Sequence, residues 1–246
     1  MAENSKIEWT DHTFNPWIGC QKVSPGCDRC YAESLAKRYG WVEWGPHGER
    51  KRTSAANWKK PRQWAAAARG ASRRPRVFCA SLADVFDNQV PDDWRKDLFD
   101  LIAATPELDW LLLTKRPENL VRMFPTGPWL NVWLGTTCED QERYDRRWPL
   151  LAAQSNVPVR FISYEPAIGP LVPHGVVVGN VFRTPDWLIC GGESGHGARY
   201  MPAEWAEQAM WQCEVNMTAF FMKQMTGKKP IPPQLMVREF PHVGAR

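Results

Sequence analysis

The sequence has no long apolar run. None of its hydrophobic segments approaches the ~20 residues that a helix needs to span a bilayer, and residues 1–6 do not read as a signal peptide. Convincing exact repeats and low-complexity tracts are missing too. These absences argue against a membrane partner and against secretion, and they predict a cytoplasmic globular protein.

The sequence also lacks the cysteine content of a disulfide scaffold. Its 7 cysteines are an odd number spread over 246 residues, which favours metal binding or catalysis by some of them over a disulfide framework. Cys79, Cys138, Cys190 and Cys213 lie far from the other three, and burial as small apolar residues is the ordinary state of such cysteines.

The remaining composition is that of a globular protein with excess tryptophan. Hydrophobic residues make up 43% and charged residues 24%, which is ordinary, whereas 14 tryptophans are many. The length fits one α/β domain as well as two smaller ones. We expect a single domain over residues 1–246.

Short apolar runs recur along the chain, each flanked by a polar, helix-compatible stretch. Such runs, bounded by proline and glycine, indicate buried strands. Apolar residues at helical spacing behind Asp92 predict a helix over 92–104. The predicted strands cover residues 14–18, 77–84, 110–117, 132–137, 159–166, 187–194 and 219–224.

Strands that alternate with helices predict a parallel sheet, because parallel connections cross over through helices. The fold class expected is therefore α/β, a partial (β/α) barrel of about six to seven units. Its active site should lie at the carboxyl ends of the strands. Residues 39–76 form an insertion after the first helix, and residues 166–186 read as a long loop or small excursion.

Cys20, Cys27 and Cys30 lie in a Gly/Pro-bearing loop after the first predicted strand, with the spacing C-x6-C-x2-C. Three thiolates without an obvious fourth ligand suit a metal centre with one open position. A structural zinc site normally closes with four ligands, so His12 or Cys79 would have to supply the fourth. A [4Fe–4S] cluster held by three cysteines leaves one iron free for a substrate or cofactor.

The insertion is basic, with no acid between Lys51 and Arg76, and tryptophans are interleaved with the charges. Basic residues neutralise phosphates and aromatic rings stack on bases, which predicts a nucleic-acid surface. A solvated basic helix whose tryptophans dock on the barrel is the alternative, and the net charge of +4 is too mild to decide. The candidate contacts are Arg50, Lys51, Arg52, Trp58, Lys59, Lys60, Arg62, Arg73 and Arg74.

Charged residues follow several predicted strands. Glu165 and Glu193 are the carboxylates best placed at a barrel mouth, for ribose or methionine binding or for proton transfer. Lys115 and Arg116 are suited to a carboxylate or phosphate, and Lys223 ends the last strand. An ordinary ion pair is the alternative for each.

The run Cys27-Asp-Arg-Cys30-Tyr31, after the first strand of a predicted barrel, resembles the radical S-adenosylmethionine (SAM) superfamily. Motifs over almost the whole chain resemble a phage-associated three-cysteine-motif family usually placed within it. These motifs are residues 13–20, 81–86, 113–117, 163–166, 191–195 and 221–224. Two features depart from the superfamily: its commonest spacing is C-x3-C-x2-C, and its Gly-Gly-Glu motif usually follows the second strand rather than the sixth.

The resemblance implies a [4Fe–4S] cluster on Cys20, Cys27 and Cys30, with SAM on the fourth iron. Reduction by an electron donor would cleave SAM to a 5′-deoxyadenosyl radical, while the protein positions the radical and excludes solvent. Glu165 and Lys223 are the implied catalytic residues. Among the implied cofactor-binding residues, Tyr31 would lie near the adenine. The methionine amino group would be bound by Gly191, Gly192 and Glu193, or by their rivals Ser81 and Asp84. Thr114, Lys115 and Glu165 complete the set.

The function predicted is that of a phage-encoded radical SAM enzyme. Its chemistry would be of the isomerase or transferase/lyase type, on a modified nucleobase in phage DNA or other nucleic acid. A base within a duplex would have to be flipped out. The alternatives are a zinc-containing nucleic-acid-binding protein without catalysis, and a photolyase-like enzyme that repairs a base lesion.

Overall fold

The structure is a computed structural model that describes residues 3–242. Within these residues the chain forms two compact units. The first unit comprises residues 3–23, 30–133 and 156–158. The second comprises residues 24–29, 134–155 and 159–242.

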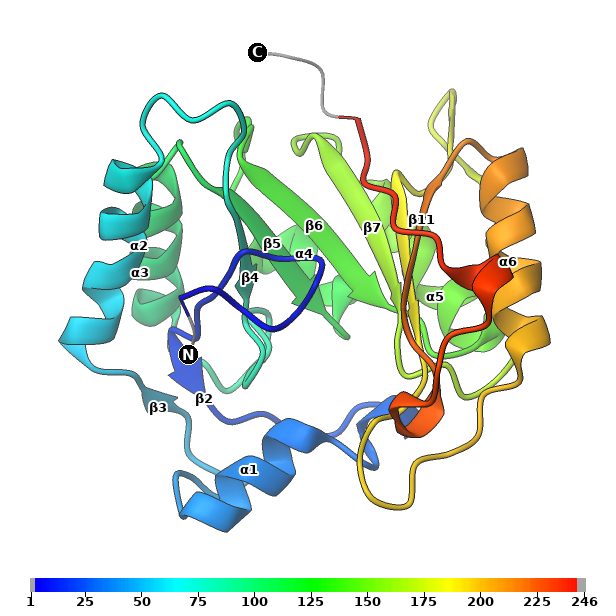
Figure 1. The fold of residues 1–246 in the computed structure, drawn as a ribbon. Helices are drawn as coiled ribbons and strands as arrows, with labels where there is room; N and C mark the ends of the chain where they lie inside the picture. The colour runs from blue at the N-terminus through cyan, green and yellow to red at the C-terminus, as the bar shows by residue number, and fades with distance from the viewer. Residues whose placement is uncertain (1–2, 243–246) are drawn as a thin grey trace. The chain divides into compact units, whose positions relative to one another are not determined.

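The main sheet of the described chain has seven strands in the order β1-β4-β5-β6-β7-β10-β11 (Figure 1). The strands are β1 His12–Thr13, β4 Arg76–Cys79, β5 Asp109–Thr114, β6 Val132–Thr137, β7 Val159–Tyr164, β10 Trp187–Gly191 and β11 Ala219–Gln224. Pairing is parallel between β1 and β4, β4 and β5, β7 and β10, and β10 and β11. The predicted alternation of parallel strands with helices is confirmed.

Local signals explain where the helices begin and end. Ser54 caps one helix by accepting a hydrogen bond from Asn57 N (3.3 Å), and Asp140 caps another through Arg143 N (2.9 Å). Gly40 ends a third in the left-handed conformation that favours glycine. The helices are α1 Tyr31–Tyr39, α2 Ala55–Ala67, α3 Asp92–Ala103, α4 Leu120–Met123, α5 Gln141–Ala152 and α6 Ala203–Val215.

The predicted first strand, residues 14–18, is wrong. The main sheet takes only His12–Thr13, and Pro16 has no N–H with which to continue a ladder. Trp17–Ile18 (β2) instead pairs antiparallel with Lys51–Arg52 (β3) in a separate ribbon. The insertion, which contains β3 and α2, is therefore tied by backbone hydrogen bonds to the segment just before Cys20.

Several other predicted strands are too long at their carboxyl ends. The strands β4, β5, β7 and β10 end two residues or more before the predicted runs do, because the polar residues that follow turn to bind neighbouring groups. The excursion at 166–186 contains the hairpin β8 Val176–Val178 and β9 Val181–Arg183. Gly179, with φ +60°, lies in its turn.

Much of the tryptophan excess fills the core. Trp17, Trp110, Trp148 and Trp187 are fully buried. Burying ~150–250 Å² of aromatic surface contributes about 4–6 kcal/mol of transfer free energy per side chain. The cysteines outside the triplet, Cys79, Cys138, Cys190 and Cys213, are buried free thiols, as predicted. Among the described residues, no helix combines the length and the apolar character that crossing a bilayer requires.

Two helical tryptophans give a matched test of this packing. Trp148 on α5 is fully buried, whereas Trp211 on α6 is 61% exposed. We expect Trp148→Ala to lower the free energy of unfolding by about 3–5 kcal/mol and Trp211→Ala to change it by less than about 0.5 kcal/mol. Chemical denaturation followed by circular dichroism measures both, and similar losses would contradict the placement of Trp148 in the core.

Candidate active site

Asp84, in the loop after β4, organises the polar residues at the end of β5. Its Oδ1 accepts a hydrogen bond from Thr114 Oγ1 (2.8 Å). Its Oδ2 accepts from Lys115 N (3.0 Å) and from Arg116 Nη1 (3.1 Å). The Asp84 side chain is buried, so both oxygens are satisfied by the protein itself. Asp84 thus positions Thr114, Lys115 and Arg116.

Arg116 brings its charge to the first cysteine. Its Nη1 lies 3.6 Å from Cys20 Sγ, and its Nη2 donates to Gln21 O (3.0 Å). Burial opposes the charge of Arg116, but Asp84 and Asp87 raise its pKa above the ordinary value. Burial raises the pKa of the Cys20 thiol to about 12 and Asp84 adds to this, while Arg116 acts in the opposite direction. Arg116 is therefore the group that stabilises an anionic sulfur at Cys20.

Tyr31 and Ser81, both predicted cofactor residues, lie together in the first unit. Tyr31 Oη donates to Ser81 O (2.7 Å), and the Tyr31 side chain is exposed. Asn15, which was not among the predicted site residues, donates to Ser81 Oγ (3.0 Å) and accepts from Leu82 N (2.7 Å). A single asparagine in the run before Cys20 therefore orders the loop after β4.

In the second unit, Glu165 and Lys223 meet across β10. The strands β7 and β11 flank β10, and Glu165 Oε1 lies 2.5 Å from Lys223 Nζ. Gly191 lies at the end of β10, where an added Cβ would come within 3.4 Å of Glu165 Cδ. The ion pair thus bridges the two strands that flank β10, next to Gly191. Both side chains remain about one-fifth exposed, at 20% and 22%.

The Gly-Gly-Glu run forms no tight turn: Gly191 ends β10, and Gly192 and Glu193 follow it without a turn. An added Cβ on Gly192 would lie 2.6 Å from Thr226 N and 2.7 Å from Thr226 Oγ1. Glu193 is buried and accepts hydrogen bonds from the backbone N (2.8 Å) and the guanidinium of Arg199. Burial alone would raise the pKa of Glu193, but the hydrogen bonds from Arg199 outweigh it and lower that pKa.

The basic residues of the insertion fall into two groups. One group is paired with acids of the same unit: Arg50 with Asp87, Arg52 with Asp97, Arg69 with Glu107, Arg73 with Asp11 and Arg74 with Asp109. The other group makes no ion pair within residues 3–242 and consists of Lys51, Lys59, Lys60 and Arg62. The arginines mainly hold the insertion in place, and the second group carries the unneutralised charge.

Two of the predicted nucleic-acid contacts face the protein. The side chain of Arg50 is 1% exposed and its Nε lies 2.7 Å from Asp87 Oδ2. The Trp58 ring packs edge-on against Phe14, and the guanidinium of Arg52 lies 4.3 Å from the centre of that ring. Arg50 is therefore not available to a nucleic acid in this arrangement, whereas Trp58 packs against the protein and stays partly exposed.

The candidate metal ligands are Cys20, Cys27 and Cys30, with His12 or Cys79 as a fourth. Among the described residues, no group of three or more His, Cys, Asp or Glu side chains is placed to hold a metal ion. Cys20 and Cys30 belong to the first unit and Cys27 to the second. His12 stacks on Trp64, with ring centres 4.4 Å apart. The donor set nevertheless suits an iron–sulfur cluster, since all three cysteines are free thiols and Arg116 supports the thiolate of Cys20.

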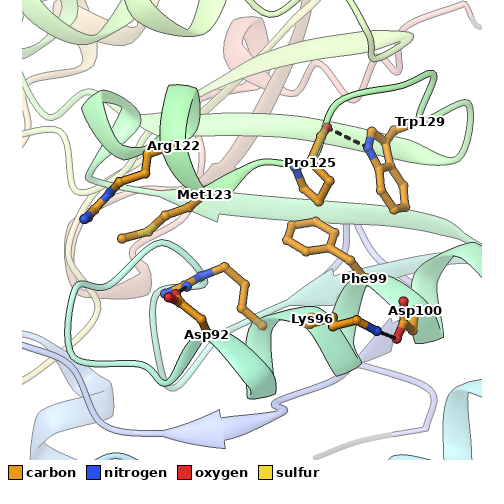
Figure 2. Close-up of a pocket in the computed structure, with 9 residues that line it drawn as sticks. Asp92, Lys96, Phe99, Asp100, Arg122, Met123, Pro125 and Trp129 are labelled. Carbon is orange, nitrogen blue, oxygen red and sulfur yellow. Dashed lines mark hydrogen bonds and ion pairs between the residues drawn. The ribbon is translucent and has the colours of Figure 1, made fainter.

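A cavity of about 400 Å³ lies elsewhere in the first unit (Figure 2). Figure 2 shows the rings of Phe99 and Pro125 facing each other across it. Its charges are satisfied within the protein, because Lys96 pairs with Asp100 (2.7 Å) and Arg122 donates to Asn88 (3.0 Å). None of the predicted site residues lines this cavity, so it is distinct from the candidate site.

The fold and the strand-end clusters define an α/β protein of the parallel-sheet, partial-barrel class. Spore photoproduct lyase shares this fold. A cysteine-to-serine variant has a TM-score of 0.57 and 11% identity, over 91% of this chain and 79% of that chain. A tyrosine-to-phenylalanine variant has a TM-score of 0.57 and 11% identity, over 92% of this chain and 79% of that chain. A variant with bound AdoMet and dinucleoside spore photoproduct has a TM-score of 0.55 and 10% identity, over 92% of this chain and 79% of that chain.

This likeness confirms the expected partial (β/α) barrel fold. The chain belongs to the DUF5131 family, described as "Protein of unknown function (DUF5131)", whose pattern matches residues 4–238. No curated protein matches the sequence significantly.

The two adjacent glycines give a matched test of the second-unit cluster. We expect Gly192→Ala to destabilise the protein by about 1–3 kcal/mol, because the new Cβ would overlap the backbone of Thr226. Gly191→Ala places its Cβ at ordinary contact distance and should cost less than about 1 kcal/mol. Thermal unfolding of both variants measures the difference, and equal losses would show that Thr226 does not restrict position 192.

Proposed function

We propose that this protein is a radical SAM enzyme. The observation that carries the proposal is the combination of three free cysteines with a fold shared by a lyase structure that contains AdoMet. Cys20, Cys27 and Cys30 would hold a [4Fe–4S] cluster, and an electron donor would have to reduce it. When bound, the cluster and SAM supply a 5′-deoxyadenosyl radical that can abstract hydrogen from an unactivated carbon.

Side chains of the first unit would bind and orient SAM. The exposed Tyr31 ring is suited to packing against the adenine, and its hydroxyl is fixed on Ser81. Lys115 forms no ion pair within the described part of the chain and is suited to the methionine carboxylate. Asp84 and Thr114 would act indirectly, by fixing the backbone of Lys115 and the side chain of Arg116.

Glu165 and Lys223 would serve the reaction as a proton-transfer pair. An ammonium group 2.5 Å from a carboxylate can donate a proton while the carboxylate accepts one. Partial exposure leaves the pair open to a substrate.

The proposed substrate is a nucleobase in phage DNA or other nucleic acid, modified by a rearrangement or a substituent transfer. The support is the set of unneutralised basic residues on and before α2, namely Lys51, Lys59, Lys60 and Arg62. Such residues bind phosphates without regard to sequence and leave base recognition to other groups.

A second candidate function is repair of a base lesion. It is favoured by a specific observation: spore photoproduct lyase, which shares the fold, is seen with a dinucleoside spore photoproduct. Both candidates require the same cluster and the same cofactor, and they differ in whether the substrate base is damaged or enzymatically modified.

Metal content and cofactor cleavage test the chemistry. Protein purified without oxygen should hold about four iron and four sulfide per chain and, when reduced with SAM present, should release 5′-deoxyadenosine. Cys20→Ala should lose the cluster and the product, whereas Cys213→Ala, at a buried cysteine outside the triplet, should keep both. Stoichiometric zinc without iron would overturn the radical SAM assignment in favour of a zinc-containing binding protein.

Charge removal on α2 tests the nucleic-acid surface. Lys59→Ala with Arg62→Ala should weaken binding to an oligonucleotide about tenfold and reduce the slope of log affinity against log salt by about 1.4–1.8. Lys37→Ala with Arg38→Ala on α1 is the matched control and should leave both quantities unchanged. Fluorescence anisotropy over a salt series measures them. Equal effects of the two pairs would show that α2 is not the binding surface.

A further inference from the structure

We infer that Arg199, held by Glu193, anchors the segment Ser24–Arg29 and thereby positions Cys27. The inference rests on the proposed function only in giving Cys27 the role of a cluster ligand. The anchoring itself is a property of the second unit, to which residues 24–29 belong.

The anchored segment is a short, compact turn. Pro25–Cys27 form one turn of 3-10 helix, closed by a hydrogen bond from Cys27 N to Ser24 O (2.8 Å). Cys27 is only 9% exposed. Because Cys27 lies inside this hydrogen-bonded turn, contacts at the two ends of the turn restrict the position of the cysteine as well.

Arg199 contacts both ends of this turn. Its Nη2 donates to Pro25 O (3.0 Å), and its Nη1 lies 3.7 Å from Asp28 Oδ2. The next residue, Arg29, places its Nη1 3.6 Å from Glu193 Oε2. One arginine therefore binds the turn directly, and its carboxylate partner attracts the residue that follows the turn.

Arg199 is itself held on three sides. Glu193 accepts from its backbone N, its Nε and its Nη2, and Thr226 Oγ1 donates to Arg199 O (3.1 Å). Hydrogen bonds between a guanidinium and a carboxylate are charge-assisted and directional. Both oxygens of Glu193 accept hydrogen bonds in this way, so this glutamate positions Arg199.

A second anchor acts at the middle of the turn. Gly26 N donates to Glu139 Oε1 (3.2 Å), and Glu139 Oε2 accepts from Arg147 Nη1 (2.7 Å). Glu139 is fully buried, so its charge depends on these donors. A Cβ on Gly26 would lie 3.0 Å from Glu139 Cδ, which is closer than an ordinary contact. Glycine at this position therefore lets the turn approach Glu139 closely.

Thiol reactivity of the metal-free full-length chain tests the anchor, because it needs neither cluster nor substrate. Alkylation of each cysteine by iodoacetamide is followed by peptide mass spectrometry, with Cys20 and Cys30 as internal references. In Arg199→Ala we expect Cys27 to react faster by on the order of tenfold, because the turn opens locally more often. Arg199→Lys, which keeps the charge but loses the fork, should restore part of the protection.

Two further variants make the outcome specific. Arg160→Ala removes an arginine of the second unit that pairs with Asp186 (3.2 Å), and it should leave the Cys27 rate unchanged. Glu193→Gln keeps the shape of the side chain, removes its charge and should raise the Cys27 rate to a smaller extent than Arg199→Ala does.

An unchanged Cys27 rate in both Arg199→Ala and Glu193→Gln would overturn the inference. Equal acceleration of all three cysteines would overturn it as well, because that pattern reports general loosening. Zinc in place of iron in the purified protein would overturn the proposed function, but it would not affect the anchoring of Cys27 by Arg199. Release of 5′-deoxyadenosine, together with a Cys27 that Arg199 does not protect from alkylation, would support the proposed function and overturn the anchor.

Discussion

Pairing of a buried carboxylate with an arginine at a strand end is the interaction on which the candidate site depends. Asp84 pairs with Arg116 in the first unit, and Glu139 pairs with Arg147 in the second. Leaving a buried charge unpaired costs about 3–5 kcal/mol, so these groups hold one another in fixed geometry. Each pair also reaches the cysteine region within its own unit. Arg116 contacts Cys20, and Glu139 binds the backbone of Gly26.

The Gly-Gly-Glu run shows how one motif can have several structural functions. Gly191 lies beside the ion pair between the two neighbouring strands, and Gly192 admits the backbone of Thr226. Glu193 holds Arg199, which in turn holds the turn that contains Cys27. The run lies after β10, far along the chain from the position of the similar motif in the superfamily that the sequence resembles. Its location and its contacts both indicate support of the cysteine loop.

The basic insertion likewise divides by function. Its arginines other than Arg62 form ion pairs with acids that are distant in sequence, such as Asp11, Asp97 and Asp109. These acids lie outside the acid-free stretch, so the run of positive charge seen in the sequence is largely neutralised in three dimensions. The remaining charge is concentrated on and before α2. The positive electrostatic potential of the insertion is therefore concentrated around these residues.

The sequence by itself determined the parallel α/β arrangement, because buried strands and crossover helices leave periodic apolar patterns that local reading detects. It also singled out the cysteine triplet and the strand-end polar residues, since their residue types and spacing carry chemical meaning. It did not determine that Trp17–Ile18 pairs in a separate ribbon outside the main sheet, because that depends on a partner strand more than thirty residues away.

Only the tertiary structure decided which charges are neutralised and which glycine is needed for which contact. Arg199 stands in a glycine-rich loop without a motif of its own, and its importance comes from meeting Glu193 and Pro25 in space. Ion pairs and close packing join residues that are distant along the chain, and their energies depend on burial, which the order of residues does not specify.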